Sequence, residues 1–228
     1  ITGESGTGKD LVAEALHYGG VYRDKPLIRF SCSSMAGNTG ESELFGHVKG
    51  AFAGAVEDRI GLLEKAENGT LFLDEIGDAH PAFQKRLYRL LQERAFERVG
   101  DDKPIGAEAR LVAATHQNLD ELVRKGEFRE DLYYRLKMLE LKIPPLRNRR
   151  EDIPLLVDHF LSVFRKGFNK EIREVSPEAL IKLMSRDWPG NVRELKHTVE
   201  QAFVLCEGSV IKLEDLLADP RATAELHG

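Results

Sequence analysis

The sequence predicts an α/β fold, with a parallel sheet between helices and a smaller, purely helical second domain. Short apolar runs alternate with helical periodicity as far as Ile143, which is typical of a parallel sheet. Beyond the paired prolines at 144–145 every periodic segment is helical, and such a pair interrupts both helices and central strands. We therefore expect an α/β subdomain over 1–145 with a truncated N-terminal edge, a helical subdomain over 146–217, and a tail or linker over 218–228.

Composition restricts the class of protein. A chain of 228 residues that is 42% hydrophobic can bury the core of a soluble globular protein, and its net charge of −5 lacks the basic surplus of a dedicated nucleic-acid-binding domain. Cys32 and Cys206 fit no metal spacing or disulfide framework, which indicates a reducing, cytoplasmic location. No apolar run is long enough to span a membrane. The first residue is not methionine and lies within an expected strand, so we expect a piece of a longer protein.

The first residues have the pattern of a phosphate-binding loop. After Ile1 and Thr2, which we take as the end of a strand, the chain reads Gly3, Glu4, Ser5, Gly6, Thr7, Gly8, Lys9, Asp10, Leu11. Glycines let backbone N–H groups surround a phosphate, the following helix adds partial positive charge, and lysine reaches the terminal phosphates. Asp10 stands where a magnesium-binding Ser or Thr is usual. The alternative is a glycine-rich turn that only caps a helix.

The remaining elements follow from periodicity and turn residues. We expect strands at 26–30, 70–73, 110–114 and 138–143, a polar turn at 100–106, and helices at 81–93, 119–125, 151–164, 177–185 and 191–205. Ligands of parallel sheets bind beyond the carboxyl ends of the strands. The residues that follow the strands are therefore candidate site residues.

Asp74 and Glu75 follow the apolar run at 70–73. An aspartate there can hold magnesium and the adjacent glutamate can polarise an attacking water, unless the pair is an ordinary strand-to-loop turn. Thr115 follows the next strand, where its hydroxyl can orient water or phosphate, or cap a helix.

Arginines form a third candidate group. Arg129 and Arg135 lie close to apolar residues, and guanidinium stabilises charge on a transferring phosphoryl group. The alternative is a pair of solvated surface arginines bound to Glu130 or Asp131. Arg193 begins a helix of the second domain, from which it can report nucleotide state.

A glycine-flanked aromatic marks a candidate contact loop. The residues are Gly50, Ala51, Phe52, Ala53, Gly54 and Ala55. The glycines permit hinging, and Phe52 has no neighbouring apolar periodicity. Phe52 either projects as a contact residue or folds back into the core.

Segments 3–10, 41–47, 50–55, 69–78, 128–136 and 188–195 together resemble the central AAA+ domain of sigma-54-dependent transcriptional activators, the bacterial enhancer-binding proteins of two-component and related regulation. The resemblance covers nearly the whole chain. It implies a homo-oligomeric ring, usually hexameric, that binds ATP and Mg²⁺ between subunits and remodels sigma-54 RNA polymerase. DNA would be reached only through a flanking domain.

By position, the resemblance makes Lys9 a phosphate ligand, Asp74 and Asp10 magnesium-site residues, and Glu75 the residue that activates water. Thr115 is the sensor on the sheet and Arg193 the sensor in the helical lid, while Arg129 and Arg135 reach the neighbour's ATP. Residues 50–55 correspond to the sigma-contacting loop.

Three positions depart from the family pattern. Ala53 replaces Thr, Ser31 replaces Asn, and Asp10 replaces Glu. The alternative function is therefore a ring-assembly module that binds ATP but does not engage sigma-54 productively.

Overall fold

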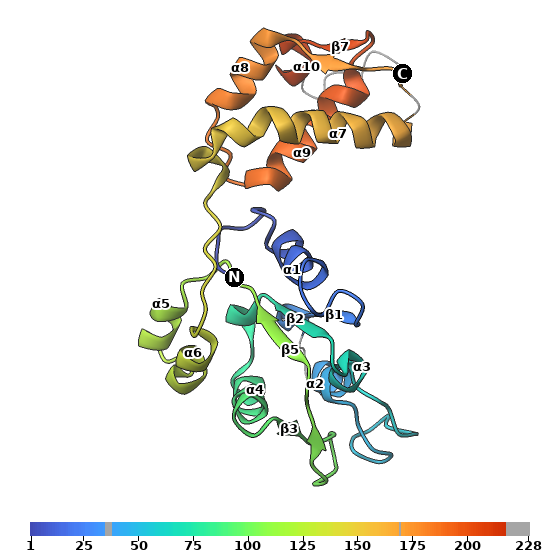
Figure 1. Ribbon diagram of the computed structural model, residues 1–228, viewed down its shortest axis with the longest axis vertical. Coiled ribbons are helices and arrows are strands. Elements are labelled where there is room, and N and C mark those ends of the chain that lie inside the picture. The colour runs from blue at the N-terminus through green and yellow to red at the C-terminus, as the bar shows by residue number, and fades with distance from the viewer. Residues whose placement is uncertain (35–37, 169, 218–228) are drawn as a thin grey trace. The chain divides into compact units, whose positions relative to one another are not determined.

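The computed structural model describes residues 1–34, 38–168 and 170–217, so the predicted tail at 218–228 lies outside the described residues (Figure 1). The chain divides into two compact units, which we describe separately. The α/β unit comprises Ile1–Gly3 and Gly8–Ile143. The helical unit comprises Glu4–Thr7 and the described residues from Pro144 onward.

A parallel sheet forms the centre of the α/β unit. Its strands are β1 (Leu27–Ser31), β2 (Thr70–Asp74) and β5 (Arg110–Ala113), in the order β1-β2-β5 (Figure 1). Thr2 adds a parallel bridge to Thr115 on the β5 side and another to Lys142. The predicted parallel sheet is confirmed, and the carboxyl ends of its strands meet at one edge.

The predicted strand at 138–143 is wrong. Only Lys142 forms a bridge there, and residues Met138 and Leu139 are 82% and 79% exposed. The N–H of Thr2 donates to Leu141 O at 2.8 Å and the N–H of Ile143 donates to Thr2 O at 2.8 Å. The recorded backbone pairing of this segment is therefore confined to the residues around Lys142.

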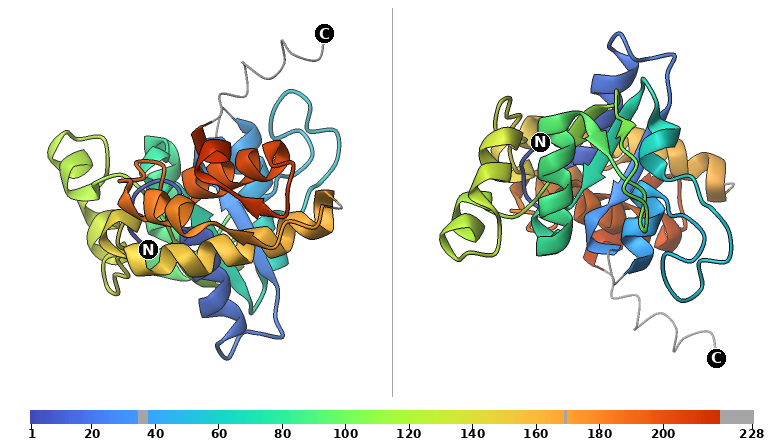
Figure 2. Two further views of the ribbon diagram at one scale, coloured as in Figure 1. Left: turned by 90° about the horizontal axis from the view of Figure 1, so that it is seen from above. Right: turned by 90° about the horizontal axis from the view of Figure 1, so that it is seen from below.

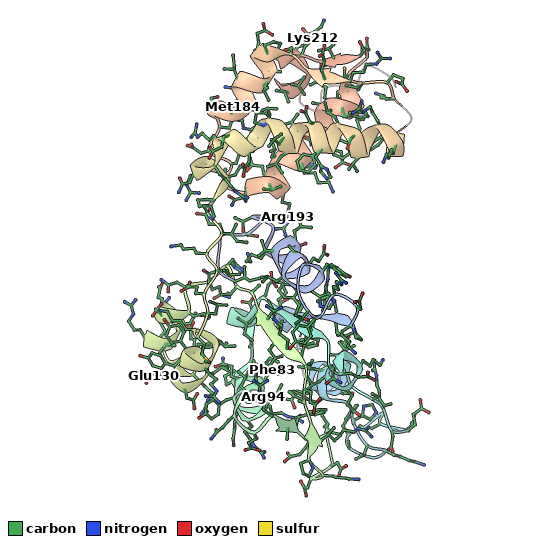
Figure 3. The ribbon with its side chains drawn as sticks, viewed as in Figure 1. Phe83, Arg94, Glu130, Met184, Arg193 and Lys212 are labelled. Atoms are coloured by element: carbon green, nitrogen blue, oxygen red, sulfur yellow. The ribbon has the colours of Figure 1, made fainter. Side chains whose placement is uncertain are left out.

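The central strand is buried on both faces. Phe72 belongs to a cluster with Ala13 of α1 (Lys9–Tyr18), whereas Leu71 and Leu73 belong to a larger cluster with Leu87 of α4 (Pro81–Glu93). Side chains of successive strand residues point to opposite faces. The continuous apolar run therefore specifies a strand between two layers of helices. Phe83, labelled in Figure 3, also joins the larger cluster.

The other elements of this unit are α2 (Asn38–Phe45), α3 (Leu62–Ala66), α5 (Leu119–Arg124), α6 (Glu130–Leu136) and the 3₁₀ turns Cys32–Ser34 and Ile76–Asp78. β3 (Ala95–Phe96) pairs antiparallel with β4 (Ile105–Gly106). The predicted polar turn at 100–106 is therefore wrong at its end. Ile105 pairs with buried Phe96, a partner that the local sequence does not reveal.

The helical unit contains α7 (Ile153–Phe168), α8 (Pro177–Ser185), α9 (Asn191–Leu205) and α10 (Leu213–Leu217), with 3₁₀ turns Leu146–Asn148 and Arg150–Asp152. Figure 2 shows α7 as the long helix of this unit, and it packs against α9. Two short strands, β6 (Glu174–Val175) and β7 (Val210–Ile211), pair in parallel. The second part of the chain is therefore helical apart from this small pairing. Across residues 1–34, 38–168 and 170–217, every helix is too short or too polar to cross a lipid bilayer.

Candidate functional site

The phosphate-loop pattern leads directly into α1. Gly6 and Gly8 have φ values of 77° and 93°, in the left-handed region that favours glycine, and Gly8 precedes the first helical residue. The ammonium of Lys9 donates to Gly3 O at 3.0 Å. Asp10 lies in the first turn of α1, and both Asp10 and Leu11 are exposed. The segment therefore has the helix-start geometry on which anion binding depends.

Glu4–Thr7 of this loop belong to the helical unit. Arg193, labelled in Figure 3, donates from Nη1 to Ser5 Oγ at 3.0 Å. The hydroxyl of Thr7 donates to Glu4 O at 2.8 Å. The structure thus brings Arg193 to the phosphate loop.

Asp74 and Glu75 lie at the carboxyl end of β2. The N–H of Glu75 donates to Asp74 Oδ1 at 3.0 Å, and Glu75 has a left-handed φ of 54°. The N–H of Ile76 donates to Ala114 O at 2.9 Å, which ties this turn to the end of β5. The acidic pair is therefore held by backbone bonds at the edge of the sheet.

Burial raises the pKa of Asp74, although the hydrogen bond from Glu75 N–H and the charge of Lys9 favour its ionised form. The negative charges of Glu75 and Asp10 raise this pKa further. Among the described residues, no group of three or more His, Cys, Asp or Glu side chains forms a complete metal site. Mg²⁺ commonly uses only one or two carboxylates together with phosphates, so this partly buried carboxylate among like charges suits a shared cation.

Replacing Asp74 with Asn is expected to raise the free energy of unfolding of the nucleotide-free protein at pH 7. The folded-state pKa of Asp74 lies above its ordinary value of 3.8, so ionised Asp74 destabilises the fold at neutral pH. The difference should vanish below that ordinary value, where Asp74 is protonated in both states. Urea unfolding at pH 7 and pH 3 tests this, and a variant no more stable than wild type at pH 7 contradicts it.

Thr115 and Ser31 flank the acidic pair. Thr115 follows β5 and is buried. Its Oγ1 accepts a hydrogen bond from Gln117 N–H at 3.0 Å, and its own N–H donates to Ile1 O at 3.1 Å. Ser31 is the β1 residue in register with Asp74, and it shares a 2.8 Å hydrogen bond with Ser33 Oγ. The sheet register therefore brings these predicted positions to the same edge as Asp74.

Arg129 immediately precedes α6 and Arg135 lies within it, and both residues are exposed. Arg129 donates two hydrogen bonds of 3.0 and 2.7 Å to Asp131. This is the pairing expected if the arginine is a solvated surface residue. Arg135 donates to Leu91 O at 3.5 Å. Among the described residues, the recorded side-chain partners of both arginines lie on α4 or α6, and the structure does not join these side chains to the phosphate loop.

The contact loop closes on itself. Gly50 N–H donates to Ala55 O at 2.8 Å, and Gly50 and Gly54 have left-handed φ values of 83° and 107°. The partly buried Phe52 ring lies 5.0 Å from the His47 ring, measured between centroids. Phe52 therefore neither projects freely nor enters the core, and it packs at the base of its own loop.

Sequence reasoning missed the residue that supports Phe52. His47 Nδ1 shares a 2.6 Å hydrogen bond with Ser42 Oγ, and the His47 backbone pairs with Arg59. Segment 41–47 was prominent in the sequence, but its spacing does not show which side chain meets Phe52.

The fold and the comparisons with known proteins place the chain among the AAA+ ATPases. The sequence model of the family described as "AAA+ ATPase lid domain" matches residues 147–227. The model described as "Sigma-54 interaction domain" matches residues 1–142, more than half of the chain. The chain belongs to the sigma-54 interaction domain family.

Curated relatives include the Nif-specific regulatory protein of Herbaspirillum seropedicae, 51% identical over 92% of this chain. Transcriptional regulatory protein ZraR of Salmonella typhimurium is 50% identical over 95% of this chain. The matches cover 39% and 49% of those proteins, so this chain spans less than half the length of each.

Solved relatives include NtrX from Brucella abortus, in complex with ADP and with ATP. Both structures are 34% identical to this chain, with TM-scores of 0.86 and 0.85. They cover 99% and 94% of this chain, and the matches span 49% and 48% of theirs. The relatives include transcriptional regulators, and NtrX is a nucleotide-bound structural relative.

Proposed function

We propose that this chain is the ATP-hydrolysing module of a bacterial sigma-54-dependent transcriptional activator. It would convert ATP to ADP and phosphate and use that free energy to remodel sigma-54 RNA polymerase at promoters. The observation that carries the proposal is the placement of Asp74 and Glu75 at the carboxyl end of β2, held by backbone bonds to each other and to the end of β5. Family membership and the NtrX complexes with ADP and ATP support it.

The phosphates of ATP would lie over the start of α1, between the loop N–H groups and Lys9. Mg²⁺, when bound, would neutralise charge between the phosphates and Asp74, with Asp10 close by. Glu75 would accept the proton of the attacking water, and the Thr115 hydroxyl would orient that water or the γ-phosphate. We assign nucleotide binding to 1–145 and the lid to 146–217, where Arg193 acts as the sensor.

A homo-oligomeric ring, which we propose to be a hexamer, would complete the site. Arg129 and Arg135 would approach the ATP of a neighbouring subunit and stabilise charge on the transferring phosphoryl group. Their exposure, at the start of α6 and within it, supports such a role in trans. Arg129 would exchange its surface pair with Asp131 for phosphate, a small cost because exposed ion pairs contribute about 0–1 kcal/mol.

The loop that bears Phe52 would contact sigma-54. Its exposed tip contains Ala53 and Gly54, and Phe52 would have to leave His47 to project. A single edge-to-face ring contact contributes about 0.5–1.5 kcal/mol, so the release is within reach of a partner contact or of nucleotide turnover. Enhancer DNA would be bound by a flanking domain of the longer protein.

Ala53→Thr tests this assignment beside wild type. We expect wild type to bind sigma-54 in the presence of an ATP transition-state analogue, and Ala53→Thr to bind it at least as tightly, since a hydroxyl and a β-branch are added at the loop tip. Phe52→Ala should reduce the binding at least tenfold. Pull-down and fluorescence anisotropy with labelled sigma-54 measure these differences.

Exposed Val56→Thr is the control, because it introduces the same side chain, threonine, just outside residues 50–55. Binding by Ala53→Thr alone would favour the assembly-module alternative, which the family match does not favour. Binding by neither form would contradict the sigma-54 assignment.

A further inference from the structure

Three consecutive carbonyls of the phosphate loop are bound by residues of the helical unit. Asn191 Nδ2 donates to Ser5 O at 3.0 Å. The N–H groups of Val192 and Arg193 donate to Gly6 O at 3.0 and 3.3 Å. Arg149 Nη2 donates to Thr7 O at 2.9 Å. These residues come from the start of α9 and from the segment before α7, both far from the loop in sequence.

These bonds determine which way the loop N–H groups face. In a trans peptide the C=O of one residue and the N–H of the next point in opposite directions. Because the carbonyls of Ser5 and Thr7 face Asn191 and Arg149, the N–H groups of Gly6 and Gly8 face away from those two side chains. Inward N–H groups are what a phosphate-binding loop requires.

The carboxylate of Glu4 is neutralised in the same place. Arg147 donates to its two oxygens at 2.8 and 2.6 Å, and Asn191 Nδ2 lies 3.2 Å from Oε2. These hydrogen bonds, that of Arg147 foremost, lower the pKa of Glu4 to about 2. An unpaired carboxylate in this loop would repel polyphosphate, so its pairing favours anion binding.

Asn191 is built into this arrangement. Its side chain is fully buried, and its Oδ1 accepts from Leu146 N–H at 2.8 Å. Its φ of 52° is a left-handed value that asparagine tolerates better than most residues. The Gly6 backbone also approaches that of Gly190 so closely that an added Cβ would lie 2.3 Å from Gly190 O. Close packing and side-chain bonds together hold Glu4–Thr7.

We propose that Asn191, Arg147 and Arg149 are positioning residues for nucleotide binding, which hold Glu4–Thr7 with the carbonyls of Ser5 and Thr7 turned toward Asn191 and Arg149 and with the Glu4 carboxylate neutralised. The inference rests on the proposed function, because it assigns how that same phosphate loop is prepared for ATP. None of these three residues needs to touch the nucleotide.

Arg147→Gln and Arg150→Gln form a matched pair that tests the role. Both arginines have side chains that are 40% exposed, and they pair with carboxylates at 2.6 and 2.7 Å. Arg147 binds Glu4 of the loop, whereas Arg150 binds Asp187 and the last two carbonyls of α8. We expect the dissociation constant of fluorescent ADP to rise about tenfold in Arg147→Gln and less than twofold in Arg150→Gln.

Two readouts without nucleotide separate positioning from general destabilisation. The pKa of Glu4, followed by carbon NMR, should rise from about 2 toward its ordinary value of 4.5 in Arg147→Gln. Asn191→Gly retains access to the left-handed backbone but removes the amide, so hydrogen exchange at Val192 and Arg193 should accelerate. Fluorescent ADP should also bind about tenfold more weakly to Asn191→Gly.

Lys9→Ala distinguishes the failure of this inference from failure of the proposed function. If wild type binds no nucleotide, or Lys9→Ala binds it as wild type does, the proposed function fails and this inference fails with it. If Lys9→Ala loses binding while Arg147→Gln and Asn191→Gly both bind like Arg150→Gln, only the positioning role is overturned. Weaker binding in both variants, with faster exchange and a raised Glu4 pKa, supports it.

Discussion

Glu75→Gln is expected to reduce ATP hydrolysis by about a hundredfold to ten-thousandfold, the usual contribution of a positioned general base. The glutamine keeps the shape of the side chain and cannot accept the proton of the attacking water. The backbone bond from residue 75 to Asp74 Oδ1 does not depend on the substituted carboxylate. Nucleotide affinity should therefore stay within a few-fold of wild type.

Phosphate release at saturating ATP and a separate binding titration measure the two quantities. Glu67→Gln is the matched control, since Glu67 is an exposed glutamate of the same unit with a left-handed φ of 39°. It should hydrolyse ATP as wild type does. A Glu75→Gln variant that retains half of the wild-type rate would exclude Glu75 as the base.

Trp188→Ala is expected to lower the free energy of unfolding of the helical unit by about 3–5 kcal/mol. Trp188 is fully buried, and its Nε1 donates to Leu183 O at 2.8 Å. The Arg186 guanidinium lies 4.2 Å from the ring centroid. Truncation would leave a large cavity just before the start of α9 and would remove the indole hydrogen bond to Leu183 O, so the contacts of Asn191 with the loop should weaken as well.

Circular dichroism during urea unfolding measures the change, because Trp188 is the only tryptophan of the chain and its fluorescence is lost on substitution. Trp188→Phe should cost less, since it retains most of the ring volume and loses the hydrogen bond. Ile181→Ala, at a side chain that is 67% exposed, should cost less than about 0.5 kcal/mol. A cost below 1 kcal/mol for Trp188→Ala would contradict the prediction.

Some features of the fold depend on short-range signals, and the sequence by itself determined them. Helix α4 has the predicted bounds because Pro81 suits a first helical position and the apolar residues recur at helical spacing. Helix α8 follows the same logic, with Ser176 Oγ accepting from Ala179 N–H at 3.3 Å. The buried run of β2 is equally local, since only a strand between two layers is apolar at every position.

Other features depend on partners distant in the sequence, and only the tertiary structure decided them. Segment 138–143 has strand composition, but within it only Lys142 forms a bridge, to Thr2. Phe52 has no local apolar neighbour, and it packs against His47 because the chain returns there to pair with Arg59. Strand propensity and an aromatic flanked by glycines are local properties of the sequence. A strand ladder or a contact between two rings also requires a partner residue from another part of the chain.

The phosphate loop shows both kinds of information. Its glycines, Lys9 and the start of α1 follow from the sequence, because left-handed backbone and helix initiation are properties of neighbouring residues. The orientation of its carbonyls does not, since that is decided by Asn191 and Arg149, more than a hundred residues away. A short motif specifies which groups are present, and packing against distant residues determines where they point.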